Sequence, residues 1–454
     1  MPTGSGVEPA DSAGAVPTRL PREVWVLVAA SFVIAVGFGI VAPALPTFAA
    51  SFGVGVTAAS VVISAFAFMR LAFAPASGRL VTAIGERPVY LLGIVIVAVS
   101  TGACAFAEQY WQLLLFRGLG GTGSTMFTVS AMALLIRLTP PTMRGQAAGL
   151  WATSFLVGNI AGPLVGGSLI AVSLRAPFVV YAASLLLAAF VAWVFLRRST
   201  LAAPDRSEGV PAVTVREALG HRTYLAALAS SFANGWAVFG VRISLIPLFV
   251  VEVLRRDAGL AGVSLAVFAA GNAAVLLLSG RLADAIGRKP LVLAGLAVSG
   301  GATIWLGFTD TVPAFLVASL VAGVGAGVLN PPQNAAVADI VGATRRGGSV
   351  LAAFQMAADV GAIVGPIATG VIADRLSYQA AFVLTGLIAL LACLVWLPAA
   401  ETLPRRAAAV LRPAGTPSVP VLSDARAAEC GCLDESAEVP TGQRLAGRPS
   451  QPES

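Results

Sequence analysis

Two stretches of the sequence repeat one another and decide the fold. Residues 280–290 read GRLADAIGRKP. Residues 78–88, which lie 202 residues earlier in the chain, read GRLVTAIGERP. Further matches occur at nearly the same spacing: Arg144-Gly145 with Arg346-Gly347, Gly162-Pro163 with Gly365-Pro366, and Phe38-Gly39 with Phe239-Gly240. A repeat of this length indicates that the chain consists of two similar halves.

Away from these loops the sequence is strongly apolar. Of its 454 residues 57% are hydrophobic and 11% are charged, whereas a soluble domain carries roughly 25% charged residues. Apolar stretches of about 20 residues, long enough to cross a bilayer, recur as far as about residue 400. They do not alternate as barrel strands do. They predict membrane helices near Val24–Phe48, Ala59–Ala76, Pro88–Phe106, Trp111–Ile136, Gly145–Leu169, Pro177–Leu196, Tyr224–Val251, Leu260–Leu278, Leu291–Phe308, Val312–Val341, Val350–Ile372 and Ala380–Leu397.

We therefore predict an all-α integral membrane protein with twelve transmembrane helices in two pseudo-symmetric six-helix bundles. The polar residues between and around the bundles are expected to be solvated, and the last segment is too rich in Pro, Ala, Gly and charge to fold alone. The predicted divisions are an N-terminal segment (1–22), the first bundle (23–196), a cytoplasmic linker (197–222), the second bundle (223–400) and a disordered cytoplasmic tail (401–454).

The basic residues follow the topology of a membrane protein. The net charge is +7, but the cations gather in the short loops on one side: Arg79, Arg87, Arg137, Arg144, Arg281, Arg288, Lys289, Arg345 and Arg346. The other side has Arg175, Arg255, Arg256 and Arg375. This asymmetry predicts an inner-membrane protein with both termini in the cytoplasm, and it needs no nucleic-acid partner.

Residues for enzymatic or metal chemistry are scarce. The sequence holds one histidine, His221, and one lysine, Lys289, and it has no phosphate-binding loop. Cys430 and Cys432 could form a metal or redox pair, but no further ligand lies near them in the sequence. We expect no enzymatic activity, no cofactor and no metal site.

The loop at 280–290 fits the pattern Gly-x-Leu-x-Asp-x-x-Gly-Arg-Lys between two helices. It resembles the signature loop of the major facilitator superfamily, a resemblance that extends over roughly residues 23–400. The resemblance implies transport by alternating access, with a cytoplasmic gating loop formed by Gly280, Arg281, Asp284, Gly287 and Arg288 and, in the first copy, by Gly78, Arg79 and Gly85. The first copy departs from the pattern, because Thr82 replaces the acid and Glu86 replaces a base.

The fifth predicted helix carries a motif of small residues: Gly149, Gly158, Gly162, Pro163, Gly166 and Gly167. Small residues at this spacing allow helices to approach closely, which by itself accounts for the pattern. The complete spacing also resembles the motif of the twelve-helix drug:proton antiporters within the superfamily. That resemblance implies export.

Four ionisable residues fall within predicted spans: Arg70, Arg117, Arg242 and Asp359. A charge at the bilayer centre costs at least about 2.5 kcal/mol, so such residues are either paired or functional. Asp359 is the one acid predicted near the middle of a span, which makes it the candidate proton carrier. Arg117 resembles the family's fourth-helix arginine that assists proton coupling. Structural pairing or snorkelling remains the alternative for all four.

Polar and aromatic residues of the predicted inner helices are candidates for the substrate cavity: Asn234, Trp236, Asn330, Gln333, Asn334 and Gln355. The alternative for the run at 330–334 is a simple proline kink. A mostly apolar cavity with few polar groups suits amphipathic compounds better than sugars.

We conclude from the sequence that this is a secondary transporter, a proton-coupled exporter of small amphipathic compounds that acts as a monomer. Two alternatives remain open at this point: an uptake symporter for a metabolite, and a polytopic membrane sensor or scaffold.

Overall fold

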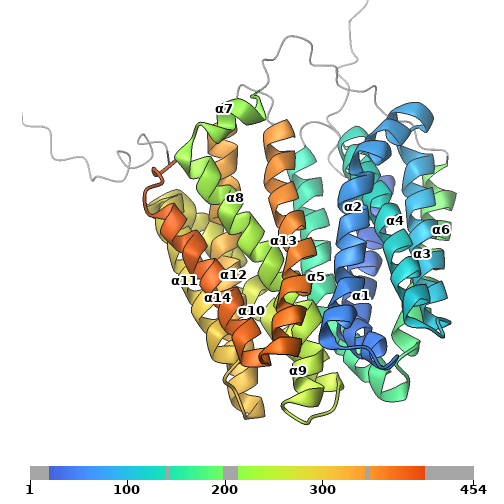
Figure 1. The fold of residues 1–454 in the computed structure, drawn as a ribbon. Coiled ribbons are helices and arrows are strands. Elements are labelled where there is room, and N and C mark those ends of the chain that lie inside the picture. Colours follow the sequence, from blue (N-terminus) through green and yellow to red (C-terminus); the bar gives the residue numbers. More distant parts are fainter. Residues whose placement is uncertain (1–19, 140–142, 198–212, 343–347, 404–454) are drawn as a thin grey trace, which may run out of the picture. The chain divides into compact units, whose positions relative to one another are not determined.

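The computed structural model describes residues 20–139, 143–197, 213–342 and 348–403. Within these ranges twelve helical segments are long and apolar enough to cross a membrane, as the hydropathy pattern predicts (Figure 1). The first half contains α1 (Arg22–Ala50), α2 (Val56–Ile84), α3 (Glu86–Ala105), α4 (Tyr110–Leu138), α5 (Arg144–Val172) and α6 (Ala176–Leu196). The second half contains α7 (Val215–Leu219), α8 (Arg222–Gly235), η2 (Trp236–Leu245), α9 (Ile246–Glu252), α10 (Gly259–Ile286), α11 (Arg288–Leu306), α12 (Val312–Val341), α13 (Gly348–Arg375) and α14 (Tyr378–Trp396).

Two tight turns mark one end of the helices, which we call the basic end. α2 meets α3 at Gly85, and α10 meets α11 at Gly287. Both glycines have positive φ, 89° and 113°, a conformation that a residue with a Cβ rarely adopts. The equivalent turns of the two sequence repeats therefore have the same backbone shape. The opposite end, where α1 meets α2 and α9 meets α10, is called the far end.

Helix packing repeats in the two halves, in keeping with the prediction of two similar halves. α1 packs against α5 in the first half, and the equivalent η2 packs against α13 in the second. A Cβ added at Gly162 would lie 2.8 Å from the Cα of Gly39. One added at Gly240 would lie 3.0 Å from the carbonyl carbon of Gly365. The paired glycines of the repeat are thus the points where backbones touch within each half.

The seventh span is not a uniform α-helix. α8, η2 and α9 run continuously over Arg222–Glu252, and the middle segment η2 is a π-helix. π-helical turns are rare and concentrate at functional sites. Hydrophobicity does not distinguish the two helix types here, so the sequence predicted only a plain span. The π-helix carries Trp236 and Arg242.

The predicted linker is described in part. After residues 198–212, which lie outside the described residues, Thr214 accepts a hydrogen bond from the Glu217 N–H at 3.2 Å and so caps α7. Val213 and Ala218 are buried in a hydrophobic cluster of the second half. This end of the segment packs against the second bundle, a contact that its polar composition did not suggest.

Several predictions concern parts of the chain outside the described residues. These are most of the N-terminal segment, Arg345 and Arg346, and the tail from residue 404 with Cys430 and Cys432.

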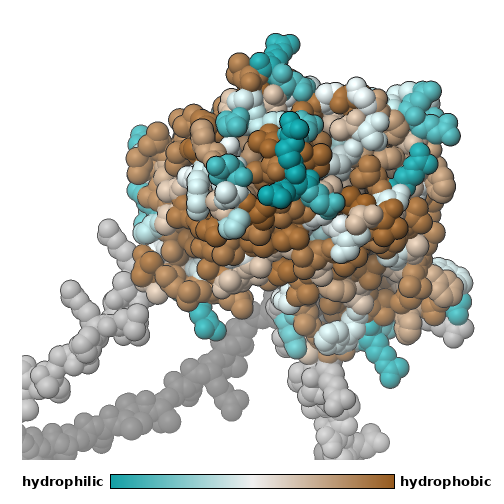
Figure 2. Space-filling view, turned by 90° about the horizontal axis from the view of Figure 1, so that it is seen from below, coloured by the Kyte–Doolittle hydropathy of each residue, from teal (hydrophilic) through white to brown (hydrophobic). Residues whose placement is uncertain are grey.

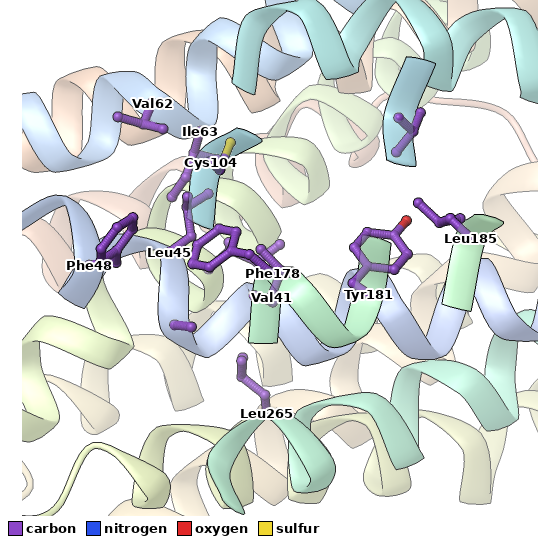
Figure 3. Close-up of a cluster of buried hydrophobic side chains, with 14 of the residues drawn as sticks. Val41, Leu45, Phe48, Val62, Ile63, Cys104, Phe178, Tyr181, Leu185 and Leu265 are labelled. Atoms are coloured by element: carbon purple, nitrogen blue, oxygen red, sulfur yellow. The ribbon is translucent and has the colours of Figure 1, made fainter. Parts of the chain in front are cut away.

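Large hydrophobic side chains occupy both the interior and the outer surface. A buried cluster joins α1, α3 and α6, and Figure 3 shows Val41 and Leu45 close to Phe178 and Tyr181 within it. Leu187, Phe190 and Leu277 are exposed by 64%, 61% and 79%. Exposed apolar side chains of this kind mark a surface that contacts a membrane. Seen from the far end, hydrophilic residues gather in separate places on a largely hydrophobic surface (Figure 2).

The two halves meet along two helix pairs, α2 with α13 and α5 with α10. Hydrogen bonds between the halves lie toward the far end. Ser60 bonds Ser244 through their hydroxyls at 2.5 Å, and Ser64 donates to the carbonyl oxygen of Ile363 at 2.7 Å. Among the described residues none of the recorded hydrogen bonds between halves lies at the basic end. The structure is therefore closed at the far end.

Candidate transport pathway

Two adjoining cavities lie inside the protein where the halves meet. The first has a volume of about 270 Å³ and lies mainly among the helices of the first half. The second has a volume of about 310 Å³ and lies between α1 and α5 of the first half and η2 and α10 of the second. Phe38, Asn159 and Phe239 line both cavities. These three residues therefore form the shared boundary of the two cavities.

The cavity walls are aromatic and basic. Phe66, Phe127, Trp151 and Phe155 line the first cavity, and Phe268 lines the second. No acidic residue lines either cavity, whereas three arginines do: Arg70, Arg117 and Arg242. The sequence did not single out the aromatic residues, because phenylalanine is common throughout membrane spans. Their positions depend on how each helix is rotated.

Arg117 lies on α4 and is buried, with 6% of its surface exposed. Its guanidinium carbon lies 4.2 Å from the centre of the Phe66 ring, within the range of a cation–π contact. Its Nε atom is buried and has no hydrogen-bond partner. No ion pair of Arg117 with a carboxylate occurs in the described part of the chain. The fourth-helix arginine thus faces the first cavity without a protein counter-ion.

Asp359 lies on α13, opposite α2 of the other half. Its charge interacts with Arg70 on α2, and its carboxylate interacts with the side chain of Gln355 one turn earlier on its own helix. Arg70 also lines the first cavity. Two of the four predicted intramembrane charges therefore lie within electrostatic reach of each other across the boundary between halves, although no ion pair joins them in the described part of the chain.

The six polar residues predicted for the substrate cavity occupy other places. Trp236 is buried and donates from Nε1 to the Thr385 hydroxyl at 3.1 Å, and Gln333 is buried and accepts from Ser230 at 2.9 Å. Asn330, through its side-chain oxygen, accepts from Gln333 at 3.4 Å and, through its backbone oxygen, from Asn334 at 2.9 Å. None of these four, nor Asn234 or Gln355, lines either cavity. Their role in a substrate path remains a prediction.

The glycine motif of α5 divides between two neighbouring helices. Cβ atoms added at Gly158, Gly162 and Gly166 would meet the backbone of α1. Gly167 and the Pro163 backbone meet α10 of the other half: a Cβ at Gly262 would contact the Pro163 carbonyl oxygen and would lie 3.0 Å from the Cα of Gly167. Gly149 has open space around it. The motif thus packs α5 against its own half on one face and against the other half at the far end.

The intact copy of the repeated loop, for which a gating role is predicted, is held by a network of charges. Arg288 donates to Asp284 at 2.8 Å, to Asp339 at the end of α12 at 3.2 Å, and to the Ala283 carbonyl oxygen at 2.6 Å. Asp339 also accepts from the Thr402 hydroxyl at 3.0 Å. Sequence analysis identified Asp284 and Arg288 but missed Asp339, because no local pattern links α12 to the loop. Gly280 and Arg281 face outward, with open space at Gly280 and an exposed side chain at Arg281.

The first copy of the loop is stabilised differently. Thr82, which replaces the acid, donates to the Gly78 carbonyl oxygen in its own helix at 3.0 Å. Glu86, which replaces a base, forms an ion pair with Arg137 on α4 at 2.5 Å. Arg79 is exposed. The negative charge of Glu86, at a position where the pattern has a base, is therefore balanced by the positive charge of Arg137 on the neighbouring helix.

Glu401, the first residue of the predicted tail, caps a helix. Its carboxylate accepts hydrogen bonds from the N–H groups of Arg288 at 2.8 Å and Lys289 at 3.0 Å, the first residues of α11. Burial alone would raise the pKa of Glu401. The N–H groups of Arg288, Leu403, Lys289 and Thr402 outweigh that effect and hold its pKa below the ordinary value. A carboxylate at a helix N-terminus is stabilising.

Replacing Glu401 by glutamine is expected to lower the free energy of unfolding by about 1 kcal/mol at neutral pH, the scale of a lost helix cap. Because the folded pKa is lowered, this stabilisation is present above the ordinary carboxyl pKa of about 4.3 and is lost as the pH falls through the folded value. Thermal unfolding of the purified variant, measured from pH 7 to pH 3, tests this. The exposed residue Glu108 provides the control, Glu108→Gln. A stability difference that persists unchanged at pH 3 would contradict the assignment.

A second carboxylate joins the halves at the far end. Asp374, at the end of α13, accepts hydrogen bonds from the N–H groups of Val56 at 2.9 Å and Thr57 at 2.8 Å and from the Thr57 hydroxyl at 2.6 Å. These groups form the beginning of α2 in the other half. We call this contact the far-end latch. The sequence did not predict it, since Asp374 and Thr57 are 317 residues apart.

Replacing Asp374 by alanine is expected to destabilise far-end closure by about 1 kcal/mol, roughly a fivefold shift toward the open arrangement, because the bonds are partly solvated. Double electron–electron resonance between spin labels at Ser51 and Arg256, one in each half, would show a larger share of long distances. Asp310→Ala, an exposed acid at the same end, is the control. Identical distance distributions in the variant and the parent would rule out the latch.

Comparisons with known proteins decide the family. The profile of the Major Facilitator Superfamily matches residues 27–263 and again residues 227–428. This chain belongs to the Major Facilitator Superfamily. The "Tetracycline resistance protein, class C" of Escherichia coli is 32% identical to it over 304 residues, which cover 65% of this chain and 76% of that protein. The "Multi-drug resistance efflux pump PmrA homolog" of Lactococcus lactis is 26% identical over 390 residues, which cover 81% and 92%.

A solved structure confirms the fold of this facilitator. The crystal structure of a bacterial homolog to the human lysosomal transporter Spinster aligns with a TM-score of 0.70 at 16% identity, over 83% of this chain and 95% of that one. The predicted family and the predicted twelve-helix fold are both confirmed. The family match and the twelve apolar helices make this a multi-pass membrane protein, and its relatives indicate a transporter of small molecules rather than an enzyme.

Proposed function

We propose that this facilitator exports small amphipathic organic compounds in exchange for protons. The observation that carries the proposal is the pair of adjoining cavities where the halves meet, whose walls are mainly apolar and aromatic and whose charged lining residues are three arginines. Sites of this kind bind compounds whose surface is mainly apolar, and they suit polyhydroxylated compounds poorly. The relatives named for tetracycline resistance and multidrug efflux support the direction of transport.

In this proposal Asp359 carries the proton and Arg70 responds to it. Protonation removes the negative charge that interacts with Arg70 across the two halves. Loss of that interaction changes both the contact between α2 and α13 and the charge beside the first cavity. Substrate and proton binding are then linked through one pair of side chains.

We further propose an orientation in the membrane. The short loops at the basic end carry most of the cations, which places this end in the cytoplasm of an inner-membrane protein, with both termini on that side. Closure at the far end then corresponds to a state closed to the outside. One buried hydrophobic cluster extends over both halves of the chain, and we propose that a single chain is the working unit.

The proposal is tested with inverted membrane vesicles whose interior is acidic. An exporter coupled to protons accumulates amphipathic dyes in such vesicles, and accumulation falls when nigericin removes the pH gradient. An uptake symporter instead moves its substrate out of the vesicle together with protons. Accumulation that ignores the gradient would exclude proton antiport.

A further inference from the structure

Arg242 is a buried cation whose charge and hydrogen-bond donors are not fully satisfied by the protein. It lies on the π-helix η2 and exposes 3% of its surface. Its guanidinium carbon lies 3.6 Å from the centre of the Phe268 ring on α10. Its Nη1 atom is buried without a hydrogen-bond partner, and no carboxylate pairs with it in the described part of the chain. A buried guanidinium without a counter-ion is costly in a membrane.

The surroundings of Arg242 define what kind of group can reach it. It lines the second cavity, together with Asn272, whose side-chain oxygen is also buried and unpaired. The remaining walls are largely apolar and include Phe38, Phe239 and Phe268. Since no acid lines either cavity, a ligand must supply the negative charge.

We infer that Arg242 binds the carboxylate of a planar aromatic anion whose ring system lies among Phe38, Phe239 and Phe268. A guanidinium presents two parallel N–H donors that match a carboxylate, and its planar face already stacks on a ring. This inference rests on the proposed function, because it names the substrate class of the same pathway. It predicts a preference for organic anions over neutral or cationic compounds of equal shape.

The test uses the purified full-length protein in lipid nanodiscs and three probes of similar shape: 2-naphthoate, the neutral 2-naphthamide and the cationic 2-naphthylmethylammonium. Equilibrium dialysis at pH 7 measures their affinities without any pH gradient. We expect 2-naphthoate to bind at least tenfold more tightly than the other two. Arg242→Gln should weaken 2-naphthoate binding roughly 10- to 100-fold, the scale of a charge-assisted hydrogen bond, and should leave 2-naphthamide binding nearly unchanged.

Two further variants make the result specific. Arg242→Lys keeps the positive charge but lacks the two parallel N–H donors of the guanidinium. Its affinity for 2-naphthoate should therefore lie between those of the parent and Arg242→Gln. Arg256→Gln removes an exposed arginine at the far end and should bind as the parent does. Retained 2-naphthamide binding shows that each variant is folded.

The inference is overturned if 2-naphthoate does not bind, if the three probes bind equally, or if Arg242→Gln binds 2-naphthoate as tightly as the parent. These outcomes are separate from failure of the proposed function. Binding is measured at equilibrium, whereas proton-coupled export is judged by gradient-dependent accumulation in vesicles. Export of cationic dyes with no preference for 2-naphthoate would overturn the substrate class alone.

Discussion

Replacing Asp359 by asparagine is expected to abolish accumulation driven by a pH gradient, with a loss of at least tenfold in inverted vesicles. Asparagine has nearly the same shape, but it cannot release a proton and carries no charge to interact with Arg70. Exchange of substrate down its own concentration gradient should continue, because the cavities themselves are unchanged. The measurement compares gradient-driven accumulation with gradient-free exchange in the same vesicles.

Two controls accompany the Asp359 variant. Asp310→Asn changes an exposed acid between α11 and α12 and should transport as the parent does. Asp359→Glu keeps the ionisable group and should retain part of the coupling. If Asp359→Asn keeps its full response to the pH gradient, Asp359 is not the proton carrier. A structural role for its electrostatic interaction with Arg70 would then be the remaining explanation.

Replacing Gly262 by valine is expected to oppose closure of the halves at the far end and to reduce transport by roughly 5- to 150-fold. A Cβ at this position would overlap the Pro163 carbonyl oxygen and lie 3.0 Å from the Cα of Gly167. A side chain at this position can be accommodated only if α5 and α10 move apart, which opens the boundary between the halves. Overpacking costs about 1–3 kcal/mol in the closed arrangement and is relieved in the open one. That cost shifts the population toward the open arrangement by roughly 5- to 150-fold.

The spin-label pair at Ser51 and Arg256 measures this shift directly, and transport assays measure its consequence. Gly301→Val is the matched control, since Gly301 lies on α11 and has no neighbouring atom within 4 Å of an added Cβ. The control should leave both the distances and the transport rate unchanged. Parent-like distances and rates in Gly262→Val would show that close approach of α5 and α10 is not needed for function.

The sequence by itself determined the architecture. The lengths of the apolar stretches predicted twelve spans, and each of them is present in the structure. The repeat predicted two similar halves, and the structure has turns of the same shape at Gly85 and Gly287 and equivalent glycine contacts in both halves. These features could be read from the chain because hydropathy, turn formation and repetition are properties of neighbouring residues.

The tertiary structure alone decided which residues meet. Asp359 lies within electrostatic reach of Arg70, and Asp374 caps the beginning of α2, although each pair is separated by about 300 residues. The cavity-lining aromatic residues and the π-helix at Arg242 were likewise not visible in the pattern. Every membrane helix is apolar on all sides, so hydropathy does not reveal which face turns inward. Helix rotation and register decide that, and both are set by contacts between distant segments.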